Sequence, residues 1–272
     1  MTSLSEQSDV DLLHLLPILA SLLFSVLCAF SISISSIDIY YVTPFPEGFS
    51  GSVGNASYFV VLSMSGALLV YLLLKRKSLK LINLITGFAL TAAVLMLSFF
   101  YLSAAASFIP HTGTLILSIL IAALADFAIF RLGGKACIVT VILLGGALGS
   151  FLGVVIPTLS AVLILVFLAV YDAFAVYYGP IGKIAHIGID QLRGLALSYR
   201  NVQIGLGDLT FYSMLSGHML FNFGFVPCFV SICGILAGCI LAFAMLQKLG
   251  VFPGLPFPIF LGVATGLLAS LI

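Results

Sequence analysis

The chain has 272 residues, of which 62% are hydrophobic and only 7% are charged. A soluble domain carries about 25% charged residues, so this chain has too few charges to cover a surface in water. The composition excludes a soluble enzyme, a nucleic-acid-binding protein and a disordered chain. The net charge of +1 gives no information about partners. A spanning helix takes about 20 residues, so two thirds of the chain would form about nine such helices. We therefore expect a lipid bilayer around most of the chain.

Nine apolar runs follow one another along the sequence, and they predict nine transmembrane helices. Strands of a membrane β-barrel would alternate in polarity, whereas these runs are apolar throughout. Pro157 divides one long apolar stretch into two runs, because proline interrupts a helix. The expected helices cover residues 12–34, 58–74, 81–108, 114–130, 136–156, 158–178, 204–225, 227–247 and 257–272.

The positive charges predict the orientation of these helices. All ten Lys and Arg residues lie in the loops after the second, fourth, sixth and eighth runs. Since cytoplasmic loops are enriched in positive charge, the N-terminus is expected in the cytoplasm and the C-terminus outside. We therefore predict an all-α, polytopic membrane protein with a single domain over 1–272. Helices one to six would lie in 1–178, a cytoplasmic loop in 179–203, and helices seven to nine in 204–272.

Three of the nine acidic residues lie inside predicted spans, where a charge costs roughly 3 kcal/mol and therefore suggests a function. They are Asp126, Asp172 and Asp208. Asp126 lies five residues before Arg131, so an ion pair or a helix–helix hydrogen bond explains it. Asp172 and Asp208 lie about 10 Å and 6 Å from the cytoplasmic ends of consecutive helices, at 1.5 Å per residue. The topology thus places these two carboxyl groups at similar depth.

Two facing carboxyl groups in a low-dielectric site cannot both ionise, so they would share a proton and titrate as a pair. Such a pair suits peptide hydrolysis: one Asp takes a proton from an attacking water, and the other donates to the carbonyl oxygen and then to the leaving nitrogen. A bell-shaped pH profile would follow. The same pair could instead relay protons or bind a cation in a transporter, and the residues alone leave both open.

Two neighbouring segments add to the pair. Gly205 and Gly207 surround Leu206 just before Asp208. Their missing Cβ atoms allow tight packing against the sixth predicted helix, room for a substrate strand beside the acid, or both. Residues 252–258, Phe-Pro-Gly-Leu-Pro-Phe-Pro, contain three prolines in six residues, so this segment should be extended before the last helix. Residues 197–203 could supply a further strand.

The other candidates have structural explanations. The five cysteines lie in apolar runs and are interpreted as packing residues. His218 has no partner ligands nearby in the sequence, so we expect helix packing and no metal site. Gly234/Gly238 and Gly262/Gly266 form GxxxG pairs that predict close helix contacts. Asn55 begins a glycosylation sequon so near a span that we expect no use of it.

Taken together, Tyr171-Asp172, Gly205-Leu206-Gly207-Asp208 and Pro253-Gly254-Leu255 resemble the YD, GxGD and PAL motifs of the presenilin and signal peptide peptidase family of intramembrane aspartyl proteases. They occur in the family's order, on the sixth, seventh and ninth predicted helices. The resemblance implies that Asp172 and Asp208 are catalytic, with the other motif residues supporting the active site and substrate binding. Gly254 stands where the family has Ala.

The resemblance also implies hydrolysis of peptide bonds within transmembrane segments of substrate proteins, without a metal or organic cofactor. A substrate helix would enter laterally, unwind and pair as a strand. The short chain resembles microbial, archaeal-type members of the family. This resemblance implies a prokaryotic plasma membrane and no obligate accessory subunits. No nucleic-acid partner is implied, and a homo-oligomer is left open. A proton- or cation-coupled transporter using the same aspartates is the alternative, and a prepilin-peptidase-like enzyme or a membrane scaffold fits less well.

Overall fold

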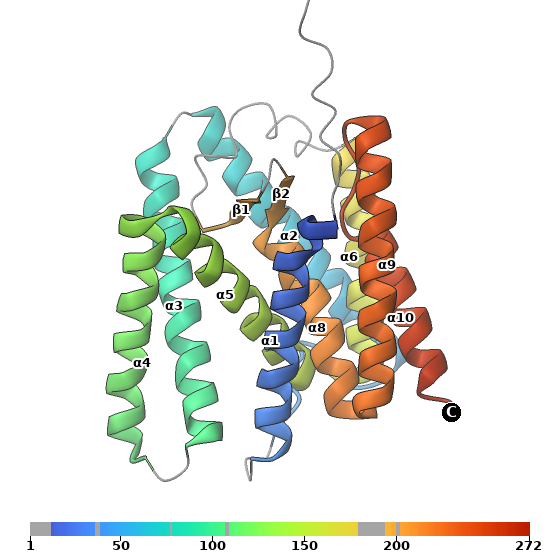
Figure 1. Cartoon of the computed structure of the whole chain (residues 1–272), viewed down its shortest axis with the longest axis horizontal. Helices are drawn as coiled ribbons and strands as arrows, with labels where there is room; N and C mark the ends of the chain where they lie inside the picture. The colour runs from blue at the N-terminus through green and yellow to red at the C-terminus, as the bar shows by residue number, and fades with distance from the viewer. Residues whose placement is uncertain (1–11, 36–38, 77, 107–108, 179–193, 200–201) are drawn as a thin grey trace, which may run out of the picture.

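The computed structural model describes residues 12–35, 39–76, 78–106, 109–178, 194–199 and 202–272. Within these ranges the chain is almost entirely helical (Figure 1). A short 3₁₀ turn, η1 (Leu12–Leu15), leads into the first helix. The α-helices are α1 (Leu16–Ser33), α2 (Phe49–Lys75), α3 (Leu79–Ala105), α4 (His111–Asp126), α5 (Gly134–Val155), α6 (Thr158–Tyr177), α8 (Leu206–Phe223), α9 (Phe225–Leu249) and α10 (Pro256–Ala269). A π-helical turn, η2 (Phe127–Leu132), extends α4.

Each of the nine predicted apolar runs is an α-helix in the part of the chain that the structure describes. Seven helical segments are long and apolar enough to cross a membrane, so the chain is a multi-pass membrane protein. The two others are α8, which carries several polar residues, and α10, whose 14 residues span only about 21 Å. The count of nine spans and the orientation of the termini therefore stay predictions.

The largest boundary difference is at α2, which begins at Phe49 and not at residue 58 as predicted. Gly51 and Gly54 precede the predicted helix 58–74, but they lie in α2. They let the preceding chain pack against α2: a Cβ at Gly51 would collide with the Pro46 carbonyl, and one at Gly54 would lie 3.1 Å from the Phe45 ring. Their role is close approach and not a turn, which the composition alone does not distinguish.

Asn55, the predicted unused sequon, is fully buried in α2. Its Oδ1 accepts a hydrogen bond from the Phe45 backbone N–H at 2.9 Å, and its Nδ2 donates to Ser160 Oγ at 3.1 Å. A side chain committed to these contacts is not accessible for glycosylation. Asn55 instead joins the 44–46 loop and α6 to α2.

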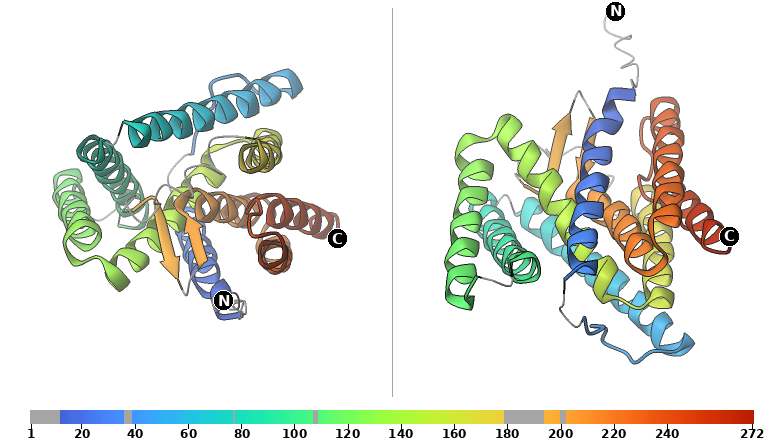
Figure 2. Two further views of the ribbon diagram at one scale, coloured as in Figure 1. Left: turned by 90° about the horizontal axis from the view of Figure 1, so that it is seen from above. Right: turned by 60° about the horizontal axis from the view of Figure 1, so that its bottom comes forward.

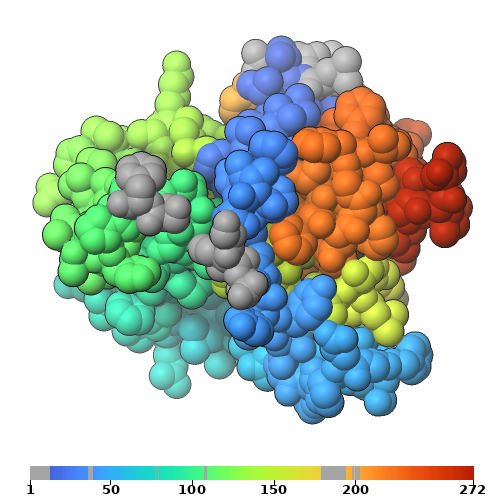
Figure 3. Space-filling model, turned by 90° about the horizontal axis from the view of Figure 1, so that it is seen from below, coloured from blue at the N-terminus to red at the C-terminus, as the bar shows by residue number. Residues whose placement is uncertain are grey.

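Helix α8 lies at the centre of the molecule, packed against α1, α5, α6, α9 and α10 (Figures 1 and 2). Between Leu209 and Leu220 all of its side chains except Phe211 are buried. The α3–α4 pair lies to one side, and α1 runs between this pair and α9 on the face shown in Figure 3. Because α8 is enclosed, residues near its N-terminus are held in a fixed position relative to several neighbours.

Glycines bring the central helices into backbone contact. A Cβ at Gly149 of α5 would lie 2.5 Å from Ser213 Cβ of α8 and 2.7 Å from the Met214 backbone nitrogen. The predicted GxxxG contacts are also confirmed: a Cβ at Gly238 of α9 would lie 2.5 Å from Pro258 Cα at the start of α10. Such spacing leaves no room for a side chain, so these glycines set the distance between helices.

A two-stranded hairpin precedes α8. Strand β1 (Ala196–Tyr199) pairs antiparallel with β2 (Val202–Gly205), and Leu197 lies opposite Ile204. Both of these side chains are buried and join the main apolar core. The predicted 179–203 loop therefore contains β1 and the first residues of β2. The buried Leu197–Ile204 pair anchors this hairpin to the core. Residues 179–193 and 200–201 of that loop lie outside the described residues.

Candidate active site

Asp172 lies on α6, five residues before its C-terminal end at Tyr177, and is partly buried. Its Oδ2 accepts a hydrogen bond of 3.0 Å from the backbone N–H of Leu255, 83 residues further along the chain. A carboxylate–amide bond of this length is well formed. Tyr171, the preceding residue, is partly buried but does not line the pocket described below. The sixth helix thus directs its aspartate toward the segment before α10.

Asp208 is the third residue of α8, which begins with Leu206 and Gly207, and Gly205 is the N-cap residue. Its Oδ2 accepts a hydrogen bond of 3.4 Å from the Gly205 backbone N–H, which caps the helix N-terminus and is electrostatically favourable there. A Cβ at Gly205 would lie 3.3 Å from this oxygen. Gly205 therefore gives room to the carboxyl group itself.

The two glycines do not pack tightly against α6, one of the alternatives that the sequence left open. Gly207 is exposed, and a Cβ there would meet only the Phe211 ring, at 3.9 Å. Leu206 instead packs toward α5, where its Cδ1 would lie 3.5 Å from a Cβ at Gly145. The backbone beside Gly207 is thus open on the side of the aspartate-bearing turn.

Residues 251–255 have no helical structure, as predicted, but Pro256, Phe257 and Pro258 form the first turn of α10 and are not extended as predicted. Proline is tolerated there because the first N–H groups of a helix have no partner within the helix. Pro253 and Leu255 are buried, and Leu255 donates its N–H to Asp172. Gly254 lies against the other acid, since a Cβ there would be 3.4 Å from Asp208 Oδ2. Two aspartates from different helices therefore contact one two-residue segment, which brings all three sequence motifs together.

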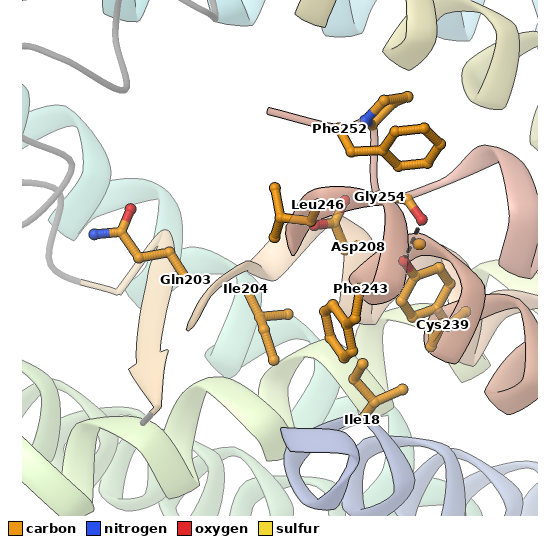
Figure 4. A pocket seen from close by; sticks show the side chains of 12 residues that line it. Ile18, Gln203, Ile204, Asp208, Cys239, Phe243, Leu246, Phe252 and Gly254 are labelled. Carbon is orange, nitrogen blue, oxygen red and sulfur yellow. Dashed lines mark hydrogen bonds between the residues drawn. The ribbon is translucent and has the colours of Figure 1, made fainter. Parts of the chain in front are cut away.

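A small pocket of about 110 Å³ opens beside Asp208 (Figure 4). It lies between α1, β2, α8, α9 and the segment before α10. Apart from Asp208, most of the lining is apolar. The lining residues are Ile18, Gln203, Ile204, Asp208, Tyr212, Cys239, Ala242, Phe243, Leu246, Phe252, Pro253 and Gly254. An acid in such surroundings is able to act on a group that enters this pocket.

Comparison with solved structures identifies the fold. One crystal structure of a presenilin-family intramembrane aspartate protease, in space group C222, superimposes with a TM-score of 0.69 and 22% identity, over 96% of this chain and 99% of that chain. A second, in space group P2, gives 0.65 and 24% over 94% and 97%. The chain has the presenilin fold. No protein-family model and no curated protein sequence matches it.

The comparisons confirm the presenilin-like fold that the order of the motifs predicted. Asp126 lies on α4 and takes no part in the described contacts of the other two acids. Asp126 Oδ2 accepts a hydrogen bond of 2.7 Å from Thr91 Oγ1 on α3. The predicted helix–helix hydrogen bond is thus confirmed, with Thr91 and not Arg131 as the partner. His218 is buried with Nδ1 2.6 Å from the Gly153 carbonyl oxygen, which confirms its packing role.

One residue of this site was missed in the sequence analysis. Tyr212 is buried one helical turn after Asp208, and its hydroxyl donates a hydrogen bond of 2.8 Å to the Gly254 carbonyl oxygen, marked by the dashed line in Figure 4. Residues four apart share a helix face. The spacing therefore predicts that the Tyr212 hydroxyl lies on the same helix face as the Asp208 carboxyl group, and this was the signal in the sequence for Tyr212.

Gly254 gives a stability prediction. A methyl group at Gly254 would meet nothing closer than 3.4 Å, so Gly254→Ala should be accommodated and should stabilise by about 0.4–1 kcal/mol through a less flexible unfolded chain. Thermal unfolding in detergent would measure it. The control is Gly224→Ala: space is also open there, but φ is +90°, so this variant should lose stability. Equal destabilisation of both variants would contradict the prediction.

Proposed function

We propose that this protein is an intramembrane aspartyl endopeptidase that hydrolyses peptide bonds within transmembrane segments, with Asp172 and Asp208 acting on one water molecule. The observation that carries the proposal is the convergence of these acids, from α6 and α8, on the Gly254–Leu255 segment. The likeness in fold to presenilin-family intramembrane aspartate proteases supports it. Tyr171, Gly205, Leu206, Gly207, Pro253, Gly254 and Leu255 are proposed to support the active site or bind substrate.

The chemistry requires two carboxyl groups in opposite protonation states. One takes a proton from water as the water oxygen bonds to the scissile carbonyl carbon, while the other donates its proton to the carbonyl oxygen. In the second step the carboxyl group that took the water proton gives it to the leaving nitrogen as the C–N bond breaks, while the other carboxylate takes back a proton from a hydroxyl of the tetrahedral intermediate as the C=O bond forms again. The pair then returns to its starting state, so no metal or organic cofactor takes part in the proposed reaction.

The substrate must be locally unwound before this attack. A helix in lipid satisfies all of its backbone hydrogen bonds internally, so unwinding exposes N–H and C=O groups that need new partners. Strand addition supplies them. Strand β2 leads directly into the turn of Asp208 and, among the described residues, pairs with β1 on one edge only. We propose that its other edge and the non-helical segment before α10 bind the unwound substrate.

The cellular setting is proposed from the sequence pattern. The distribution of Lys and Arg favours a cytoplasmic N-terminus and nine spans, with helices one to six in 1–178, a cytoplasmic loop in 179–203 and helices seven to nine in 204–272. The resemblance to archaeal-type members favours a prokaryotic plasma membrane and activity without accessory subunits. Substrates would be the transmembrane helices of other proteins.

The test is reconstitution of the purified full chain in liposomes with a substrate that has a single transmembrane helix. Mass spectrometry should find two peptide products whose new termini lie inside the helix. Ion-sensitive dyes in the same liposomes measure proton and cation flux. Absence of products from several such helices, together with ion flux that depends on Asp208, would replace the protease by the transporter.

A further inference from the structure

One peptide group, between Gly254 and Leu255, is bound on both sides by the two aspartate-bearing helices. Its carbonyl oxygen accepts a hydrogen bond of 2.8 Å from Tyr212 Oη on α8. Its N–H donates a hydrogen bond of 3.0 Å to Asp172 Oδ2 on α6. The peptide bond is trans, so its C=O and N–H point in opposite directions. This peptide group therefore bridges α6 and α8.

The position of the bridge relates it to both acids. Asp172 is a direct partner, and Asp208 lies against the Cα of Gly254, with its Oδ2 3.4 Å from where a Cβ would be. The rings of Phe252 and Phe257, on either side of the bridge, stack with centroids 5.4 Å apart and an interplanar angle of 15°. The ends of the segment are thus held together, and the hydroxyl of Tyr212 fixes the rotation of the peptide plane between them.

Rotation of this peptide plane would be costly to the site. The residue Tyr212 is only 4% exposed. Without its hydroxyl, the Gly254 carbonyl loses the hydrogen bond that faces α8. The plane could then turn, and a turn moves the Leu255 N–H away from Asp172, because C=O and N–H belong to one rigid unit. The titratable groups around the bridge are Asp172 on α6, Asp208 and Tyr212 on α8, and Cys239 on α9.

The geometry points to Tyr212 as a positioning residue for the aspartate pair: by holding the Gly254 carbonyl, it directs the Leu255 N–H at Asp172 and keeps Gly254 against Asp208. The effect on catalysis rests on the proposed function, whereas the effect on the bridge does not. Tyr212 acts through the bridge and does not need to touch substrate. A hydroxyl whose role is positional should matter for turnover more than for substrate binding.

The first experiment observes the bridge directly by NMR in detergent micelles or nanodiscs. Carbonyl-¹³C glycine and amide-¹⁵N leucine together label only Gly-Leu peptide bonds. The sequence has four: Gly194-Leu195, Gly205-Leu206, Gly254-Leu255 and Gly266-Leu267. Gly254→Ala assigns the Leu255 signal by removing it. Asp172→Asn should move the Leu255 amide proton upfield, because a neutral amide oxygen is a weaker acceptor than a carboxylate. Tyr212→Phe should also move it upfield.

The second experiment measures cleavage kinetics and has a matched control in Tyr101. Its hydroxyl, on α3, donates a hydrogen bond of the same 2.8 Å to a backbone carbonyl, that of Ala147 on α5. Tyr212→Phe should lower kcat by about five- to ten-fold, the effect of one lost hydrogen bond, and leave KM within about two-fold. Tyr101→Phe should leave kcat, KM and the Leu255 signal unchanged, while both variants lose a similar amount of thermal stability.

The outcomes separate the bridge from the proposed function. If Tyr212→Phe leaves the Leu255 signal at the wild-type position, or lowers kcat no more than Tyr101→Phe does, Tyr212 is a structural residue only and the inference is wrong. If the wild type forms no peptide product while the Leu255 signal responds to Asp172→Asn and Tyr212→Phe as described, the bridge is upheld and the protease proposal fails.

Discussion

Asp172→Asn and Asp208→Asn are each expected to lower the rate of peptide cleavage by at least about 10²–10⁴-fold, the contribution of a general acid or base. Asparagine keeps the shape of the side chain but cannot exchange a proton with water or with the leaving nitrogen. Its Oδ1 can still accept from the Leu255 or Gly205 N–H. The folded structure should therefore survive, and product formation in liposomes measures the chemical loss alone.

The double variant Asp172→Asn/Asp208→Asn should be about as inactive as either single variant, because residues that act as a unit are strongly non-additive. Asp126→Asn is the matched control, since Asp126 is the third intramembrane acid and bonds only to Thr91 on α3 in the described structure. It should cleave at close to the wild-type rate. Cleavage that survives in either single variant, or that is lost equally in Asp126→Asn, would refute the proposed pair.

The positions of the helices could be predicted because they depend on local sequence. Apolar runs of this length have few alternatives in a membrane protein, and Pro157 separates α5 from α6 as expected. The similar depth of Asp172 and Asp208, which follows once consecutive helices are assumed to run in opposite directions, stays a prediction. The motif order then added the fold, which the structural comparisons confirm.

The contacts that organise the site could not be predicted in the same way. The Leu255–Asp172 bond joins residues 83 positions apart, and the Tyr212–Gly254 bond joins residues 42 apart. No periodicity in the sequence encodes such pairs. The spacing of Tyr212 from Asp208 indicates a shared helix face, but it does not indicate the hydrogen bond to Gly254. Gly51 and Gly54 of α2 fell outside the predicted helix for a related reason: a glycine that permits close packing and a glycine in a turn look alike in the sequence.

Gly149→Ala is expected to destabilise the protein by about 2–3 kcal/mol, near the upper part of the usual cost of overpacking a core. A methyl group at Gly149 of α5 would collide with the Thr210 carbonyl and lie 2.5 Å from Ser213 Cβ and 2.7 Å from the Met214 nitrogen, all on α8. Two of these three atoms are backbone, so no side chain can rotate away. Equilibrium unfolding of detergent-solubilised protein would measure the loss.

Gly66→Ala provides the control, because Gly66 also lies within a long apolar helix, α2, and a methyl group there meets nothing within 4 Å. It should be neutral or stabilising by about 0.4–1 kcal/mol. Comparable stability of the two variants would show that α5 and α8 can separate at little cost. If instead only Gly149→Ala is destabilised, the backbone contact between α5 and α8 holds α8 in place. The same contact then holds Asp208 and Tyr212, which lie on α8, next to the Gly254–Leu255 bridge.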